Sequence, residues 1–214
     1  MSNYRLTDEQ RQLKEAARRF AEEKLRPIAL ETERQGAPMS RETLKLLAEH
    51  GYVGLDIPAE FGGLGLNIME CAIVLEELSS VWFSASTNAM TLLTGPLLAF
   101  GTEEQKQKYL PAIVSGDILT AFALTEPDAG SDASSIQSFA RKDGDDWVIN
   151  GRKIYITNGA RADLIVLFAR TDKAAPRGEG ITLFLVEKGT PGFSVGQSYD
   201  MLAHTANPVA ELVF

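Results

Sequence analysis

The chain has 214 residues but only one cysteine, Cys71, and two histidines, His50 and His204. One cysteine cannot form an internal disulfide, and so few thiols and imidazoles give no ligand set typical of a transition-metal site. Cys71 lies in an apolar stretch with helical spacing. We therefore expect a reduced thiol in the core, no metal site and a reducing compartment.

The sequence also lacks an excess of positive charge and a long hydrophobic run. Lys and Arg total 21 against 29 Asp and Glu, giving a formal charge of −8 that is spread over both halves. A basic face for nucleic acid is therefore not expected. No run of about 20 apolar residues and no targeting segment occurs. We expect no membrane span and a cytoplasmic location.

Two common catalytic motifs are missing as well. The segment Gly62-Gly63-Leu64-Gly65 follows no strand, precedes no Lys-Ser/Thr pair and does not complete a dinucleotide-binding pattern. It predicts a tight glycine turn after Pro58. No Gly-x-Ser-x-Gly motif indicates a serine hydrolase. His50 stands at an expected helix end, where a capping role is the default.

Residues 1–116 predict a helical domain. Capping-box patterns begin helices at residues 7–10 and 67–70, and Thr102 begins the last helix, which ends by Gly116. Ser40 is expected to cap a further helix that Gly51 ends. Proline cannot continue a helical hydrogen-bond ladder, so Pro27 is expected to kink or end the first helix near Leu25. Gly95-Pro96 is expected to interrupt the apolar segment 85–100.

Residues 117–214 predict an antiparallel β domain, because the hydrophobic period changes from 3.6 to 2. The pairs Asp143-Gly144, Asn150-Gly151 and Asn158-Gly159 are typical of hairpin turns. Stronger strands are expected at residues 164–169 and 181–186, joined by the polar loop 171–180. The last four residues read as the start of a strand, so we expect the natural chain to continue.

The most informative stretch is residues 121–132, AFALTEPDAGSD. An apolar strand ends here in a turn rich in Pro, Gly, Ser and Asp. Such a turn exposes backbone N–H groups and hydroxyls that can hold a polar cofactor edge. The residue chemistry alone favours an ordinary turn with local Ser and Asp hydrogen bonds.

Residues 124–132, LTEPDAGSD, closely resemble the signature of the acyl-CoA dehydrogenase family. Three further stretches agree with this family in order and spacing: residues 57–65 (IPAEFGGLG), 101–111 (GTEEQKQKYLP) and 150–159 (NGRKIYITNG). The resemblance covers essentially the whole chain. It implies an α+β protein with an all-helical domain (1–116) and an antiparallel β-barrel or sandwich-like domain (117–214). The family's C-terminal four-helix domain has no counterpart in this sequence.

The resemblance also implies an FAD site. The turn would line the flavin, with Thr125 bonding to its ring, and Tyr155, where the family usually has Trp, would keep an aromatic plane. Thr157 would bring its hydroxyl near flavin N5, and Ser131 would also touch the acyl-CoA. The implied FAD-binding residues are Phe122, Ala123, Leu124, Thr125, Gly130, Ser131, Tyr155, Ile156 and Thr157.

The implied reaction is α,β-dehydrogenation of an acyl-CoA thioester in a homo-oligomer, dimer or tetramer, of fatty acid metabolism. Electrons would pass to an electron-transfer flavoprotein. The family's catalytic glutamate belongs to the C-terminal domain, so no catalytic residue is assigned in this chain. Glu126 and Asp132 are expected to be structural. Thr205 replaces the family's common Arg, which indicates an unusual substrate subgroup.

Two other functions remain open from the sequence. One is an acyl-CoA oxidase or flavin monooxygenase on the same fold, in which O₂ takes the electrons. The other is a non-catalytic fragment or binding subunit that needs another chain for its base.

Overall fold

The computed structural model describes residues 5–90 and 92–214, which fall into two compact units. Unit 1 contains Met1–Asp117 with His204–Ala206, and unit 2 contains Ile118–Ala203 with Asn207–Phe214. The expectations for residues 1–4 and for position 91 lie outside the described residues. Helices fill the first part and strands the second, so the α+β fold class is confirmed. In the described ranges, no helix combines the length and apolar character of a membrane span.

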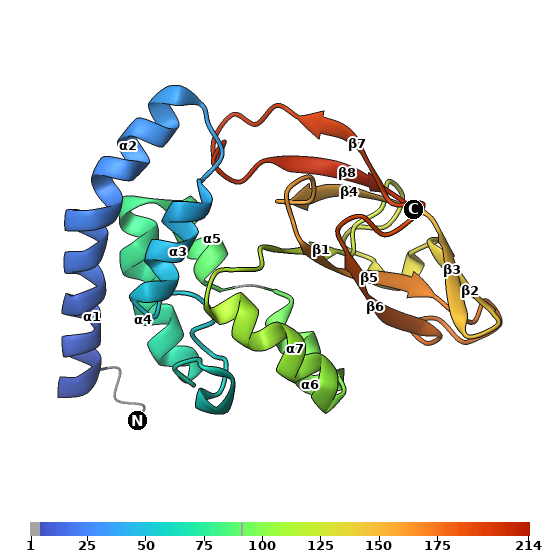
Figure 1. Ribbon diagram of the computed structural model, residues 1–214, viewed down its shortest axis with the longest axis horizontal. Coiled ribbons are helices and arrows are strands. Elements are labelled where there is room, and N and C mark those ends of the chain that lie inside the picture. Colours follow the sequence, from blue (N-terminus) through green and yellow to red (C-terminus); the bar gives the residue numbers. More distant parts are fainter. Residues whose placement is uncertain (1–4, 91) are drawn as a thin grey trace. The chain divides into compact units, whose positions relative to one another are not determined.

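One long helical run opens unit 1. It consists of α1 (Asp8–Phe20), a π-helical turn (Ala21–Leu25) and α2 (Arg26–Gln35), as Figure 1 shows for the two α-helices. The predicted capping box of Thr7 and Gln10 is confirmed. Pro27 lies in the first turn of α2, directly after the π-helical turn, and its missing N–H leaves one bond of the helical ladder unmade. The disturbance expected near Leu25 is therefore a π-turn, and the helix continues beyond it.

The other helices of unit 1 are α3 (Arg41–Glu49), α4 (Ile68–Val81), α5 (Phe83–Ala89), α6 (Thr94–Phe100) and α7 (Glu103–Val114). The predicted caps Ser40, Asn67 and Thr102 are confirmed. The interruption predicted at Gly95-Pro96 is wrong in position. Both residues lie in the first turn of α6, because proline is tolerated where the N–H groups need no helical partner. The break comes earlier, between Ala89 and Thr94.

The lone thiol and the predicted helix-end histidine both match expectation. Cys71 is free and buried in α4, and burial raises the pKa of its thiol. His50 follows α3 directly, and its Nδ1 lies 2.9 Å from the Leu46 carbonyl oxygen. Cys71 is thus a core residue, and His50 is a capping residue.

The glycine turn after the short 3₁₀ helix Ala59–Phe61 is also confirmed. Gly62 and Gly65 have φ of +88° and +61°, in the region that favours glycine. A Cβ on Gly63 would lie 2.1 Å from the Ile57 carbonyl oxygen. Gly62 and Gly65 thus provide the positive φ of the turn, and Gly63 allows the close approach to Ile57.

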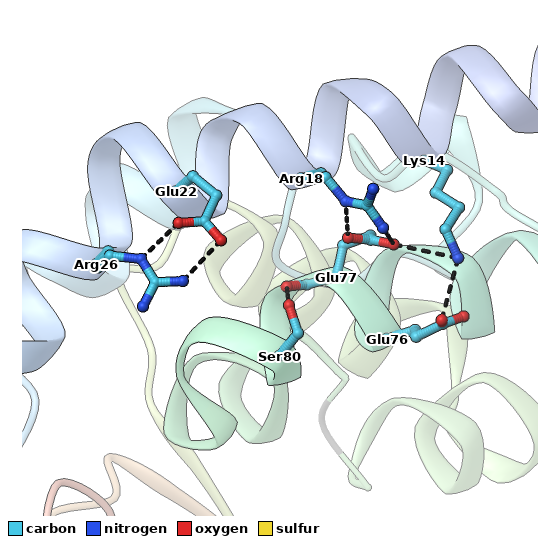
Figure 2. Close-up of polar contacts among 7 residues, drawn as sticks. All are labelled: Lys14, Arg18, Glu22, Arg26, Glu76, Glu77 and Ser80. Atoms are coloured by element: carbon cyan, nitrogen blue, oxygen red, sulfur yellow. Dashed lines mark hydrogen bonds and ion pairs between the residues drawn. The ribbon is translucent and has the colours of Figure 1, made fainter.

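A buried carboxylate fastens α1 to α4 (Figure 2). Glu77 has a side chain only 3% exposed, and it accepts hydrogen bonds of 2.8 and 3.0 Å from Arg18. The Lys14 ammonium lies 3.1 Å from Glu77 and 3.0 Å from Glu76. These contacts bridge residues about 60 positions apart. The same figure shows a second pair, Arg26 with Glu22, that stays within the first helical run.

A short piece of the chain's C-terminal part belongs to unit 1. The Met39 N–H donates to the Ala206 carbonyl at 2.8 Å, and the Thr205 hydroxyl donates to Glu33 at 3.2 Å. The His204 ring, at φ +62°, lies 4.4 Å from the ring of Phe83. The segment that departs from the family pattern is therefore held by helical residues.

Unit 2 contains two sheets (Figure 1). The first sheet has the order β1-β5-β2-β3, and β6 also pairs with β5; the second has the order β4-β8-β7. The strands are β1 (Thr120–Ala123), β2 (Phe139–Asp143), β3 (Asp146–Asn150), β4 (Arg152–Thr157), β5 (Leu164–Arg170), β6 (Ile181–Glu187), β7 (Ser194–Tyr199) and β8 (Val209–Val213).

Most strand pairs are antiparallel, as predicted, but β1 and β2 both run parallel to β5. Parallel neighbours need a crossover connection, and here the chain between β1 and β5 builds β2, β3 and β4. The hairpin at Asp143-Gly144 is confirmed, since β2 and β3 pair across it. Hairpins at Asn150-Gly151 and Asn158-Gly159 are wrong, because β4 pairs with β8 rather than with β3 or β5.

One hydrophobic cluster joins both sheets of unit 2. The first sheet contributes Ala121 and Ala123 from β1 with residues of β5, and the second contributes Ile156 and Leu212. Phe122, between the two alanines, packs instead on Phe168 with ring centroids 4.9 Å apart. The alternation along β1 thus fixes which side chains enter the core.

Candidate functional site

The turn that follows β1 is closed by its own backbone. Glu126 donates its N–H to the Ala129 carbonyl at 2.9 Å, and Ala129 donates back to the Glu126 carbonyl at 3.2 Å. Gly130 and Ser131, which come next, are exposed. The predicted Pro- and Gly-rich turn therefore presents its far end to solvent.

A buried ion pair lies beneath this turn. The Lys153 ammonium, with a fully buried side chain, donates to Glu126 Oε1 at 2.7 Å, and the Glu126 side chain is 5% exposed. Lys153 also donates to the Leu124 carbonyl oxygen at 3.0 Å. The Glu126 carboxylate accepts the Gln137 N–H at 2.5 Å and the Ser138 N–H at 2.9 Å. One pair of side chains therefore ties the turn to β4 and to the approach to β2.

Both groups of this pair have shifted pKa values. Burial would raise the pKa of Glu126, but the hydrogen bonds from Gln137, Lys153 and Ser138 outweigh burial and hold this pKa below its usual value. Burial lowers the pKa of Lys153, although the hydrogen bond to Glu126 opposes that shift. The carboxylate is thus stabilised as an anion by three donors, as a buried charge requires.

The strand β4 is irregular where it passes the turn. Its register with β8 shifts between Lys153 and Ile156, and Tyr155 has φ +56°. The bulge leaves Tyr155 62% exposed, with its ring 4.8 Å from that of Tyr199. The Ile154 N–H donates to the Thr125 carbonyl at 2.9 Å. The bulged strand and the turn are therefore held side by side.

Several donors at this edge are left without partners within residues 5–90 and 92–214. No acceptor is found there for the N–H or the hydroxyl of Thr125, for the hydroxyl of Thr157, or for the N–H groups of Gly130 and Ser131. Thr125 and Thr157 are half-buried. Unpaired donors beside an exposed aromatic ring suit a flat polar ligand that accepts hydrogen bonds.

The predicted FAD-binding residues fall into three groups by burial. Ala123 and Ile156 are buried in the core cluster, so neither presents a side chain to a ligand. Phe122, Leu124, Thr125 and Thr157 are half-buried, whereas Gly130, Ser131 and Tyr155 are exposed. The hydrogen bond from Ile154 to Thr125 brings the two predicted segments together.

The second acid of the signature, Asp132, is held by local contacts. Its carboxylate accepts hydrogen bonds from Ser134, Ser135 and Arg177. Led by the two serine hydroxyls, these contacts lower the pKa of Asp132 to about 2. Like Glu126, it is tied up in structural bonds, and neither acid is poised as a base.

Sequence reasoning did not single out Lys153. In a regular strand Lys153, Tyr155 and Thr157 would share one face, which hides the difference between a buried lysine and an exposed tyrosine. The sequence signal for a role of Lys153 is its position two residues before Tyr155, within the family-like stretch 150–159. In the part of the chain that the structure describes, no three His, Cys, Asp or Glu side chains gather as a metal site.

Two family models match the chain. The acyl-CoA dehydrogenase N-terminal domain matches residues 7–117, and the acyl-CoA dehydrogenase middle domain matches residues 121–214. A mitochondrial isovaleryl-CoA dehydrogenase of Pongo abelii is 40% identical over 217 residues, covering 98% of this chain and 51% of that protein.

Two solved structures are also similar. One, described as the electron transferring flavoprotein of Acidaminococcus fermentans, has a TM-score of 0.91 and 40% identity, covering all of this chain and 56% of that one. The FAD complex of PigA has a TM-score of 0.92 and 33% identity, with the same coverage. The chain spans about half the length of the curated relatives it matches. With both family models matched in order, this chain belongs to the acyl-CoA dehydrogenase family.

Proposed function

We propose that the protein binds FAD and catalyses α,β-dehydrogenation of an acyl-CoA thioester, with electrons passing to an electron-transfer flavoprotein. Family membership supports this function, as do the relatives named for isovaleryl-CoA and for an FAD complex. The observation that carries the proposal is the edge of unit 2 where the unpaired Thr125 and Thr157 donors lie beside the exposed Tyr155 ring.

The donors and the ring fit a flavin. An isoalloxazine ring is flat and presents several acceptor atoms, so Tyr155 would cover it while Thr125 and Thr157 donate hydrogen bonds to its edge. The exposed N–H groups of Gly130 and Ser131 add further donors on the same turn. Ser131 would also contact the acyl-CoA. Gly130 has no atom within 4 Å of a built Cβ, so this end of the turn is open.

When bound, FAD supplies the acceptor for the hydride that leaves the β-carbon of the thioester. The residues of this chain orient the two ligands and place donors where negative charge develops on reduction. Removal of the α-proton needs a carboxylate base. Glu126 and Asp132 are engaged in structural bonds, so we assign the base to neither.

The test uses protein expressed from the complete coding sequence. We expect a yellow protein with stoichiometric FAD, whose absorbance bleaches when an acyl-CoA is added anaerobically. Reoxidation should be fast with an electron-transfer flavoprotein and slow in air. Fast reoxidation by O₂ would indicate the oxidase or monooxygenase instead, and protein without flavin would contradict the proposal.

We further propose a homo-oligomer, dimer or tetramer, acting in fatty acid metabolism in the cytoplasm. The family resemblance supports the assembly and the pathway, and the free Cys71 thiol fits a reducing compartment. Light scattering of the purified protein tests the assembly, where a monomer would contradict it. Fractionation of the source cells tests the location.

A further inference from the structure

The Lys153 ammonium donates to two acceptors, and the two hydrogen bonds have different effects. Its bond to Glu126 neutralises a buried charge, whereas its bond to the Leu124 carbonyl places a cation 3.0 Å from a main-chain oxygen. The Leu124 C=O and the Thr125 N–H belong to the same planar peptide unit, whose atoms share electrons by resonance. A cation on the oxygen therefore draws electron density from the nitrogen and strengthens the N–H as a donor.

The donor at the other end of this peptide is unused. Within the described ranges, the Thr125 N–H has no acceptor, although the Thr125 carbonyl accepts from Ile154. The pair lies in the interior, with Lys153 fully buried and Glu126 nearly so. Water therefore does little to screen the charge, and its effect on the peptide is larger than at a surface.

We propose that Lys153 tunes the reduction potential of the bound flavin through the Leu124–Thr125 peptide, in addition to holding the turn against β4. The inference rests on the proposed FAD site. Reduction adds negative charge to the flavin, so a stronger Thr125 donor stabilises the reduced form more than the oxidised form. Lys153 is thus a positioning residue that raises the potential without touching the flavin.

A structural clamp alone makes a different prediction. Lys153→Met removes the cation and leaves Glu126 buried without its partner, so fold stability and FAD affinity fall under either view. The double variant Lys153→Met/Glu126→Gln removes both charges. Because no buried charge is then unpaired, this variant stays folded and recovers part of the stability and FAD affinity that Lys153→Met loses, although the new amide NH2 faces an N–H of Gln137 or Ser138 where a carboxylate oxygen stood. If Lys153 acts electrostatically, the flavin reduction potential of the double variant lies below that of the wild type. If Lys153 is only a structural clamp, the two potentials are equal.

The control is Arg152→Met, the neighbouring position on β4. It changes the net charge by as much as Lys153→Met does, but the Arg152 side chain is 58% exposed and pairs with Glu211. Solvent screens a charge at this position, so the potential should not move.

The experiment measures three quantities on the protein from the complete coding sequence: the FAD dissociation constant, thermal unfolding, and the potential by equilibration with a reference dye. For the double variant we expect an FAD affinity closer to that of the wild type than the affinity of Lys153→Met. The reduction equilibrium of the double variant should be about tenfold less favourable, as when a charge-assisted bond becomes a neutral one, which is about 30 mV for a two-electron couple. Arg152→Met should match the wild type.

A double variant with the wild-type potential would overturn the inference and leave Lys153 a clamp only. A shift as large in Arg152→Met would overturn it as well, since a surface charge would then suffice. If the wild-type protein itself takes up no FAD, the proposed function fails, and this result is distinct from a loaded protein whose potential ignores Lys153.

Discussion

Tyr155 occupies the left-handed region at φ +56°, where a Cβ costs about 1–2 kcal/mol. Glycine has no such cost. We expect Tyr155→Gly to be more stable than Tyr155→Ala by about 1 kcal/mol, although in an ordinary strand glycine is the weaker residue. Chemical denaturation of both variants measures the difference. At Ile154, whose φ is not positive, the order should reverse, and alanine exceeding glycine at both positions would contradict the strain.

Thr157 provides the second prediction at this scale. We expect Thr157→Val to keep FAD but to reduce its flavin about tenfold more slowly with acyl-CoA, for a loss of about 1.4 kcal/mol. Valine keeps the β-branched shape that suits β4. Rapid mixing under anaerobic conditions measures the bleaching.

Thr157→Ser is the matched control, since it keeps the hydroxyl and should keep most of the rate. Thr157 also precedes Asn158, whose N–H donates to the Pro208 carbonyl. A valine variant that reduces as fast as the wild type would leave Thr157 a strand-end residue only.

The site could be predicted from sequence only in part, for a reason visible at single residues. The motif marked Thr125 and Tyr155, but nothing in the alternation of β4 indicates that its register shifts between Lys153 and Ile156. The bulge depends on pairing with β8, a strand more than 50 positions away. Long-range pairing therefore decides which of two neighbouring side chains is buried.

Elements were predictable where their signals are local. Caps such as Ser40 and Thr102 act through hydrogen bonds three residues away, so they can be read from the sequence. The interruption of the apolar segment 85–100 was predicted at the wrong position, because Gly95-Pro96 is compatible with a helix's first turn as well as with its end. The parallel pairing of β1 with β5 depends on the crossover and had no local signal.

The contact between α1 and α4 gives a prediction at the scale of elements. Removing Arg18 leaves the buried Glu77 with Lys14 alone, so Arg18→Gln should lower the free energy of unfolding by about 1–2 kcal/mol. This value allows for solvent screening of the exposed guanidinium.

The matched control is Arg26→Gln, which breaks the Glu22 pair within one helical run. Both side chains of this pair are about half exposed, 48% and 46%, so solvent screens the pair and the loss should be smaller than that of Arg18→Gln. Chemical denaturation compares the two variants. Equal losses would mean that the burial of Glu77 does not strengthen its pair.

At the scale of the whole molecule, carboxylates in both units have lowered pKa values, including Glu77, Glu126 and Asp132. Such groups stabilise the fold above their ordinary values of 4.5 and 3.8, and the contribution is lost as the pH falls through their folded values. We expect the unfolding free energy to fall from about pH 5 toward pH 2.

Glu77→Gln tests one of these contributions. The variant should be less stable than the wild type at pH 7, and its stability should fall less steeply in acid because one titrating group is gone. Thermal unfolding across this range measures both slopes. Parallel curves would show that Glu77 does not contribute to the acid limb.

The fold class itself was predictable because it depends on the change of period near residue 117, a property summed over many positions. Which residues belong to each compact unit could not be predicted in this way. That residues 204–206 belong with the helices depends on three contacts, none of which leaves a periodic trace.

Because residues 204–206 belong to unit 1, that unit can be completed only late in the synthesis of this part of the chain. Glu33 leaves the ribosome 172 positions before Thr205, which at 5–20 residues per second is on the order of 10–30 s. During this interval the N–H of Met39, between α2 and α3, has no partner, because the Ala206 carbonyl has not been made. Although the helices are translated first, their contacts with residues 204–206 can form only after this interval, and a chaperone can bind there in the meantime.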